Sequence, residues 1–149
     1  MRAVVQRVTF AAVESEGVRV GEISAGSCVF VGVSRDDAEA DASALAGKVV
    51  GIRIFEDEGG KMNRDLLEAG GSLLAVSQFT LLGDVRKGRR PSFGDAMEPE
   101  RANVLFERFV TECRDLGAKV ETGRFRTHMK VLLENDGPVT MLLDTRKAF

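Results

Sequence analysis

Short apolar segments occupy the N-terminal part of the chain, and this pattern predicts β-strands. Four such segments lie at residues 3–8, 12–16, 18–23 and 28–33, with glycines and charged residues between them. Short apolar runs bounded by turn residues are typical of strands. We therefore expect these residues to begin a sheet.

Two later segments have the spacing of helices instead. After Asp36 and Glu39, which resemble a capping box, apolar residues recur every three or four positions, so we predict a helix over residues 37–51. Pro99 suits the first turn of a second helix and Gly117 suits its end, with a stripe of apolar side chains between them. We expect the helices to pack their apolar faces on the sheet.

The remaining apolar segments predict strands at residues 73–76, 119–122, 129–134 and 139–143. Only a short link separates the last two, which makes them a candidate hairpin, although Gly137-Pro138 is an unusual turn dipeptide. The chain of 149 residues contains no internal repeat, low-complexity tract or linker. We expect one domain, residues 1–149, that buries a core without disulfides or metals.

Composition excludes several classes of protein. No stretch of about 18 apolar residues is present, and the N-terminal residues lack the apolar core of a signal peptide, so we expect neither secretion nor a membrane partner. Cys28 and Cys113 lie among apolar residues and resemble small buried hydrophobes. These features are typical of a cytoplasmic protein.

Charge identifies one local candidate for RNA binding. Because 21 basic residues are balanced by 23 acidic residues, the net charge of −2 does not by itself indicate a nucleic-acid partner. Arg86, Lys87, Arg89 and Arg90 nevertheless concentrate positive charge just before Pro91. A phosphate-binding loop and an ordinary solvated loop are equally consistent with this segment.

The residue types of several common active sites are missing. The sequence has a single histidine, His128, which we interpret as an exposed residue at a strand end, because nothing places a nucleophile beside it. There is no zinc-like spacing of cysteine and histidine, no Walker lysine loop and no dinucleotide-binding fingerprint. We therefore expect neither a metal nor an organic cofactor.

Hydroxyl and amide side chains gather at the end of the strand predicted for residues 73–76. Ser77, Gln78, Phe79 and Thr80 are candidate catalytic residues, because unpaired backbone N–H groups at a strand end can stabilise an oxyanion during ester cleavage. Thr80 is also a candidate nucleophile, but no base accompanies it in the sequence. In a purely structural interpretation, the serine and threonine hydroxyls only cap backbone groups.

A second polar segment, from Asn135 to Thr140, interrupts the last apolar run. An X–Pro bond in a folded protein is usually trans, in which case Gly137-Pro138 would only end a strand. A cis bond would instead present two carbonyl oxygens on a stiff frame, which suits a wall that discriminates molecular shape. Asn135 and Asp136 can fix such a frame through hydrogen bonds to the backbone.

Together these segments resemble the D-aminoacyl-tRNA deacylase family. The two polar motifs carry the resemblance, and four further segments match in the same order over nearly the whole chain: Gln6-Arg7-Val8, Gly60-Lys61-Met62-Asn63, Arg90-Pro91-Ser92-Phe93 and Thr122-Gly123-Arg124-Phe125. The resemblance implies an α+β fold, in which antiparallel strands form a curved, barrel-like sheet layer with two helices packed against it. It also implies a homodimer.

The resemblance further implies roles for particular residues. Gly137 and Pro138 of one subunit, joined by a cis bond, would reach into the active site of the other subunit, at the interface. Arg7 would brace this loop, and Phe125 and Met129 would contribute to substrate binding. The Ser-Gln-Phe-Thr segment would line the pocket, with backbone donors facing the ester.

The implied activity is hydrolysis of the ester bond that joins a D-amino acid to tRNA. D and L isomers contain the same atoms, so we expect the Gly-Pro wall to exclude the L isomer, with glycine also accepted, including glycine mischarged on tRNA-Ala. Attack by water, helped by the neighbouring ribose hydroxyl, and covalent attack by Thr80 are two open routes. Two other functions stay open: a non-catalytic module that binds the tRNA acceptor stem, and a hydrolase of a small ester.

Overall fold

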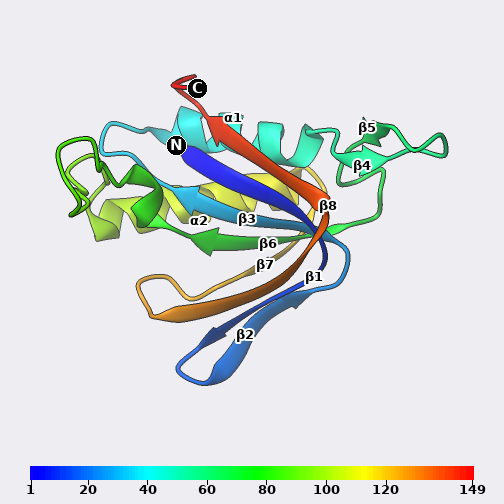
Figure 1. Cartoon of the computed structure of the whole chain (residues 1–149), viewed down its shortest axis with the longest axis horizontal. Coiled ribbons are helices and arrows are strands. Elements are labelled where there is room, and N and C mark those ends of the chain that lie inside the picture. The colour runs from blue at the N-terminus through cyan, green and yellow to red at the C-terminus, as the bar shows by residue number, and fades with distance from the viewer.

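The computed structural model describes residues 1–149, and its sheet is organised around one long strand, β1 (Arg2–Ser15). This strand joins the first two predicted strands, residues 3–8 and 12–16, into one continuous strand. Its first half pairs antiparallel with β3 (Gly26–Gly32), and its second half pairs antiparallel with β2 (Val18–Ile23). The last strand, β8 (Met129–Asp144), lies antiparallel along the other edge of β1 (Figure 1).

The sheet is mixed rather than purely antiparallel, which corrects the prediction. β3 pairs parallel with β6 (Ser72–Ser77), and β6 pairs parallel with β7 (Lys119–Thr122), so the strand order is β2-β1-β3-β6-β7 with β8 beside β1. Each parallel pair is joined by a crossover that contains a helix, as parallel strands require. The sheet curls into a barrel-like layer, so the predicted α+β architecture is confirmed.

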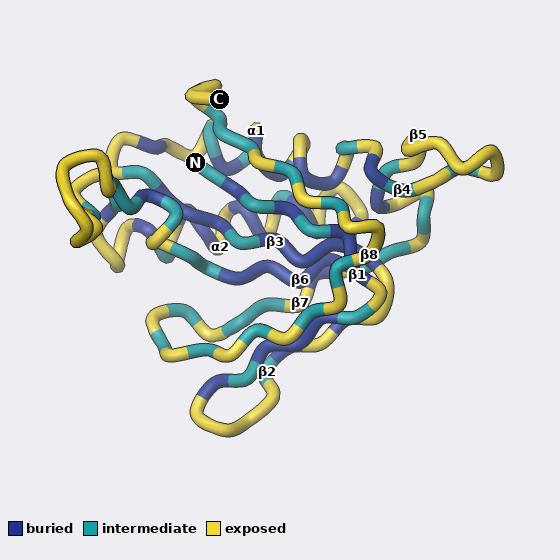
Figure 2. The backbone as a smooth tube through the Cα atoms, viewed as in Figure 1, coloured by how far each residue is buried: buried dark blue, intermediate teal, exposed yellow.

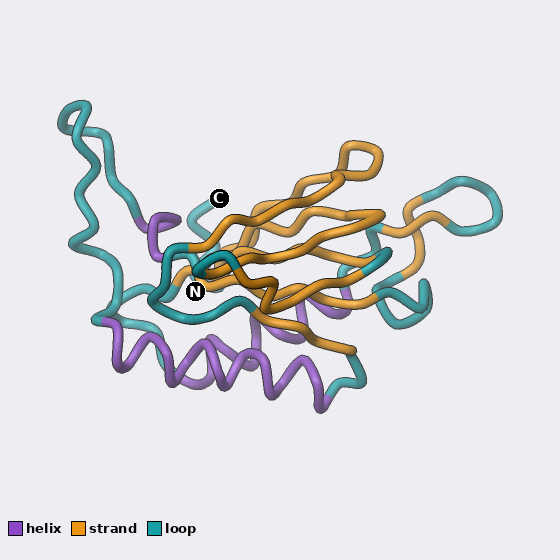
Figure 3. Tube along the Cα trace, turned by 90° about the horizontal axis from the view of Figure 1, so that it is seen from below, coloured by secondary structure: helices purple, strands orange, loops and turns teal.

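Two helices, α1 (Glu39–Gly51) and α2 (Pro99–Asp115), pack against each other below the sheet (Figure 3). Their existence and their bounds agree closely with the prediction. The cap of α1 lies two residues later than predicted, because the N-cap is Ala38 rather than Asp36, and the carboxylate of Asp41 rather than that of Glu39 accepts a hydrogen bond from the N-cap N–H, at 3.0 Å. Asp41 thereby satisfies a backbone donor at the start of the helix.

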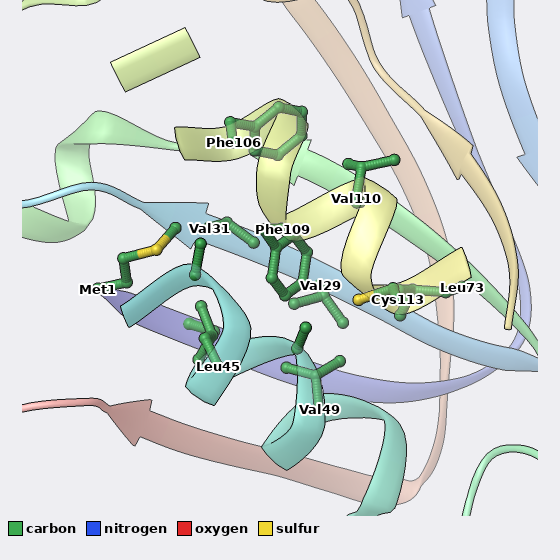
Figure 4. Packing of buried hydrophobic residues seen from close by; sticks show 14 of the residues in the cluster. Met1, Val29, Val31, Leu45, Val49, Leu73, Phe106, Phe109, Val110 and Cys113 are labelled. Carbon is green, nitrogen blue, oxygen red and sulfur yellow. The ribbon is translucent and has the colours of Figure 1, made fainter. Parts of the chain in front are cut away.

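The main core lies between the helices and the sheet (Figure 4). Phe109 of α2, Leu45 of α1 and Val29 of β3 are all fully buried in it. Cys113 belongs to the same cluster, and Cys28 belongs to a smaller one on the β2 side of the sheet. Burial raises the pKa of both thiols to about 12, so the cysteines act as small hydrophobes, as predicted.

β8 is one strand with an interruption, and the predicted hairpin is wrong. Asn135 pairs with Val8 and Thr140 pairs with Gln6, so both halves of β8 follow β1 in the same direction. Residues 136–139 form a bulge between these pairs. Two apolar segments around a short polar link have the same alternation in a hairpin and in a bulged strand, so the pattern alone did not distinguish them.

Two small elements lie at opposite ends of the sheet. β4 (Phe55–Glu56) and β5 (Met62–Arg64) form a hairpin, and its turn is held by the Asp57 carboxylate. The 3₁₀ helix η1 (Phe79–Leu82) follows β6. Figure 2 shows that the tip of the β4–β5 hairpin and the loop after η1 are exposed. Neither α1 nor α2 is long and apolar enough to cross a membrane.

Candidate active site

The chain turns sharply after β6, at the first polar motif. Ser77 ends the strand, and the Gln78 N–H donates to the Val31 carbonyl of β3 at 2.7 Å. The Leu81 N–H then closes the first turn of η1 by donating to the Gln78 carbonyl at 3.3 Å. Strand alternation therefore stops at Ser77 and does not set the directions of the two residues after Gln78.

The first two amides of η1 belong to Phe79 and Thr80. Amides at the start of a helix have no acceptor within that helix, and both residues are exposed. The Gly83 N–H donates to the Thr80 carbonyl at 3.0 Å and closes the other end of the turn. Two neighbouring backbone donors at the surface can hold the negative oxygen that develops when an ester is attacked.

A cavity of about 630 Å³ opens beside η1. Its walls are mainly apolar and come from β3, the end of β6, the start of α2 and the chain that leads into β8. Five of the predicted site residues line it: Ser77, Gln78, Phe79, Phe125 and Met129. Its volume and apolar lining are typical of a site for a small molecule or for one end of a larger ligand.

Several wall residues of this cavity were missed by the sequence analysis. Phe106 belongs to the apolar stripe of α2, and nothing in the local pattern separates a core aromatic from one that lines a cavity. His128 is exposed just before β8 and also lines the cavity, beside Arg126, whose guanidinium pairs with Glu100 at 3.0 Å. Phe93 reaches the same wall from the loop after η1.

Thr80 does not line the cavity, and its hydroxyl accepts a hydrogen bond from the side-chain amide of Gln78. No carboxylate or imidazole is hydrogen-bonded to that hydroxyl. A hydroxyl without an adjacent base is a weak nucleophile. The structure also contains no group of three or more His, Cys, Asp and Glu side chains placed to hold a metal ion.

The second polar motif forms the exposed bulge of β8, where the Gly137–Pro138 peptide bond is cis. The side-chain amide of Asn135 holds the base of the bulge by donating to the carbonyls of Arg7 and Val139, at 3.0 and 2.9 Å. The Arg7 guanidinium, which is buried, donates to the Asp136 carbonyl at 3.2 Å. Arg7 therefore contacts the bulge directly from the neighbouring strand.

Within one chain, the bulge and η1 lie at opposite ends of the sheet. Arg7 pairs with Ser27 at the start of β3, whereas Gln78 is bonded to Val31 near its end. At about 3.3 Å per residue, the four residue steps from Ser27 to Val31 span roughly 13 Å. Gly137, Pro138 and Arg7 accordingly do not line the cavity beside η1.

The predicted RNA-binding residues lie on an exposed loop after η1, but one of the four is neutralised. Asp84 binds the Arg86 guanidinium through two contacts, at 2.9 and 2.7 Å. Hydrogen bonds from Arg86 lower the pKa of the Asp84 carboxyl to about 2, so the pair is fully charged near neutral pH. Lys87, Arg89 and Arg90 are exposed and form no ion pair within the chain.

Comparison with known proteins identifies the family to which the sequence is related. Residues 4–144 match the family model described as D-Tyr-tRNA(Tyr) deacylase. A D-aminoacyl-tRNA deacylase of Symbiobacterium thermophilum is 61% identical over 149 residues, which are 100% of this chain and 99% of that protein. One of Thermotoga petrophila is 58% identical, with 100% of both chains covered.

Solved structures show the same fold. A structure of "c-Myc DNA Unwinding Element Binding Protein" has a TM-score of 0.92 and 37% identity, covering 97% of this chain and 99% of that one. A probable eukaryotic D-amino acid tRNA deacylase, at 20% identity and a TM-score of 0.78, covers 95% of this chain and 97% of its own and matches in fold. The chain therefore belongs to the D-Tyr-tRNA(Tyr) deacylase family and is a hydrolase of the ester bond in D-aminoacyl-tRNA.

Proposed function

We propose that the protein removes D-amino acids from tRNA at a site that two copies of the chain build together. One copy contributes η1 and its cavity, and the other contributes the Gly137–Pro138 bulge. The observation that carries this proposal is the separation of these two elements within one chain, where each is exposed and neither contacts the other. In a two-fold dimer, each copy gives its bulge to its partner, so two equivalent sites form.

The backbone of η1 supplies the main chemical contribution. The amides of Phe79 and Thr80 donate to the ester oxygen as it becomes negative, and one such donor is typically worth about 3–4 kcal/mol of transition-state stabilisation. Water attacks the ester, and the neighbouring ribose hydroxyl of the tRNA takes part in moving the proton. The environment of the Thr80 hydroxyl supports this route over covalent attack, because no base is bonded to it.

The Gly137–Pro138 bulge discriminates between the isomers by exclusion. A pocket contact with a side chain separates isomers of equal composition by only about 1–3 kcal/mol, whereas a clash with a rigid wall is more selective. Two backbone carbonyls placed where an L side chain would point reject that isomer, and a D side chain points away from them. Glycine has no side chain to exclude, so glycyl-tRNA, including glycine mischarged on tRNA-Ala, is also a substrate.

The loop after η1 binds the tRNA body. Lys87, Arg89 and Arg90 carry free positive charge on this exposed loop, and phosphate contacts by such residues give affinity without base specificity. Arg86 contributes less than the sequence suggests, because Asp84 neutralises it. These contacts favour a tRNA substrate over a small free ester.

Single-turnover hydrolysis of matched D- and L-tyrosyl-tRNA, with enzyme in excess and a chelator present, tests the activity. We expect rapid loss of the D ester alone, and slower but complete loss of glycyl-tRNA. Hydrolysis of both isomers at one rate would contradict exclusion of the L isomer. Binding of tRNA without any hydrolysis would indicate the non-catalytic module instead, and equal hydrolysis of a small D-ester would indicate the small-ester hydrolase.

Mixing two variants tests the shared site. Phe79→Pro removes a donor of η1 and keeps the bulge, whereas Gly137→Ala distorts the bulge, keeps η1 and should hydrolyse the L ester as well as the D ester. After subunit exchange at equal amounts, half of the intact η1 elements face an intact bulge of the partner, so hydrolysis of L-tyrosyl-tRNA per Gly137→Ala subunit should fall by about half while hydrolysis of D-tyrosyl-tRNA is unchanged. A site built within one chain would give no change in either rate.

A further inference from the structure

Phe79 combines an amide of the proposed oxyanion site with a side chain that is largely outside the core. Phe79 is 58% exposed, which is unusual for a phenylalanine. Phe93 packs edge-on against it, with ring centroids 5.0 Å apart and planes inclined at 67°. This is a favourable aromatic geometry, so Phe93 restrains a side chain that the core does not hold.

Gly83 brings the loop after η1 into close contact with the turn itself. A Cβ atom at this position would lie 3.0 Å from the Thr80 carbonyl oxygen and 3.1 Å from the Phe93 ring. The Gly83 N–H already donates to that same carbonyl. The Phe93 ring and the Thr80 carbonyl therefore both lie close to Gly83, which has no side chain to separate them.

The loop between these residues is a closed arm. Asp84 and Ser92 exchange two backbone hydrogen bonds, of 2.8 and 2.9 Å, at its base. Figure 3 shows the arm, residues 84–92, projecting away from the sheet next to η1. The free cations Lys87, Arg89 and Arg90 lie between Asp84 and Ser92 in the chain, and Phe93 directly follows Ser92.

We propose that Phe93 is a positioning residue for the deacylation reaction. Its ring connects the cationic arm, residues 84–92, to η1. Its ring holds Phe79, and thereby the two amides at the start of η1, at a set position relative to the arm. Phosphates bound by the arm and an ester bound by η1 then keep a fixed spatial relation. This inference rests on the proposed function of η1 and of the arm, and it assigns Phe93 a role separate from contact with the reacting atoms.

Substitution of Phe93 separates positioning from binding. In single-turnover assays with D-tyrosyl-tRNA, we expect Phe93→Ala to lower the saturating rate by about 10- to 100-fold, because small displacements of oriented donors cost rates of this size. The concentration of enzyme that gives half of the maximal rate should change by less than about twofold, since the cations remain. Phe93→Tyr keeps the ring and should restore most of the rate.

Two further variants distinguish positioning from a general loss of structure. Phe149→Ala removes a ring that is 65% exposed at the C-terminal end and should leave both parameters unchanged. Phe93→Ala could lower the melting temperature, so Phe93→Leu, which keeps an apolar side chain of similar size, serves as a second variant. We expect Phe93→Leu to have wild-type stability and the same loss of saturating rate as Phe93→Ala. Gly83→Ala, which pushes the ring and the Thr80 carbonyl apart, should produce the same type of loss.

Several outcomes would overturn the inference. A wild-type saturating rate in Phe93→Ala or in Phe93→Leu would show that the ring does not position η1. A change in half-saturation alone would make Phe93 a binding residue of the arm. If the unmodified protein does not hydrolyse D-tyrosyl-tRNA, the proposed function fails first, so the two failures are distinguishable.

Discussion

The Arg7 guanidinium binds the β8 bulge at Asp136, where its Nε lies 3.2 Å from the carbonyl oxygen and 3.2 Å from a carboxylate oxygen. Its Nη1 donates to the Ile54 carbonyl at 2.8 Å. Arg7 is only 7% exposed and its contact with Ile54 is buried, whereas Asp136 lies at the surface. One side chain of β1 therefore links the bulge that carries Gly137-Pro138 to the segment before β4.

Loss of this link should affect both stability and isomer discrimination. Arg7→Ala leaves two carbonyls without their donor, and we expect it to lower the free energy of unfolding by about 1–3 kcal/mol. Because the bulge is then less rigid, the ratio of D- to L-tyrosyl-tRNA hydrolysis rates should fall, mainly through faster loss of the L ester. Arg19→Ala, which removes exposed ion pairs with Glu14 and Glu22, is the matched control and should change neither quantity appreciably.

Gly137→Ala should destabilise the protein and impair discrimination. Gly137 has a φ of +121°, and a Cβ atom there would lie 2.8 Å from Nη2 of Arg7. Strain of this kind costs about 1–3 kcal/mol. Chemical denaturation measures the loss, and a stability equal to that of the unmodified protein would contradict this account of the bulge.

Substitution of a second glycine should change the free energy of unfolding in the opposite direction. Gly47 lies within α1, and a Cβ atom there would meet nothing within 4 Å. Gly47→Ala should therefore raise the free energy of unfolding by about 0.5–1 kcal/mol, because alanine favours a helix more than glycine does.

A pair of substitutions at Phe79 isolates its amide from its ring. Gln78 before it is not helical, with a φ of −146° and a ψ of 80°, so proline is compatible with the start of η1. Both Phe79→Pro and Phe79→Ala lose the ring, but only the first loses the N–H donor. We expect the saturating rate of Phe79→Pro to be about 100- to 1000-fold below that of Phe79→Ala. Equal rates would exclude this amide as an oxyanion donor.

The ion pair of Asp84 and Arg86 should control how many cations the arm offers to RNA. Asp84→Ala frees Arg86, so the slope of log affinity for tRNA against log salt concentration should steepen by about 0.7–0.9. Arg89→Ala should make the slope shallower by a similar amount. Arg86→Ala should change the slope little. A change in slope as large as that of Arg89→Ala would contradict the pairing of Arg86 with Asp84 in the structure.

The same pair predicts a pH dependence. The pKa of Asp84 is lowered from 3.8 to about 2, mainly by hydrogen bonds from Arg86. The carboxylate stays charged above that range, and its pairing with Arg86 is lost only as the pH falls through about 2. Between pH 7 and pH 5, the salt slope for tRNA binding should therefore stay constant in the unmodified protein.

The local patterns of the sequence determined the elements of this fold. The apolar stripe of α2 with Pro99 and Gly117 at its ends, and the apolar segments in β1 and β3, predicted a helix and strands that the structure contains. Buried cysteines and an exposed His128 followed from the same patterns. These predictions succeeded because hydrophobic periodicity and end residues act over a few positions of the chain.

Only the tertiary structure decided how these elements combine. Whether β3 and β6 run parallel depends on where the crossover through α1 returns, and whether residues 129–144 form a hairpin or one bulged strand depends on their pairing with β1. The cavity beside η1 joins Phe93, Phe106 and Phe125 from three distant segments. Such contacts depend on the packing of the whole chain, and no local pattern of residues encodes which aromatic side chain lines a cavity and which fills the core.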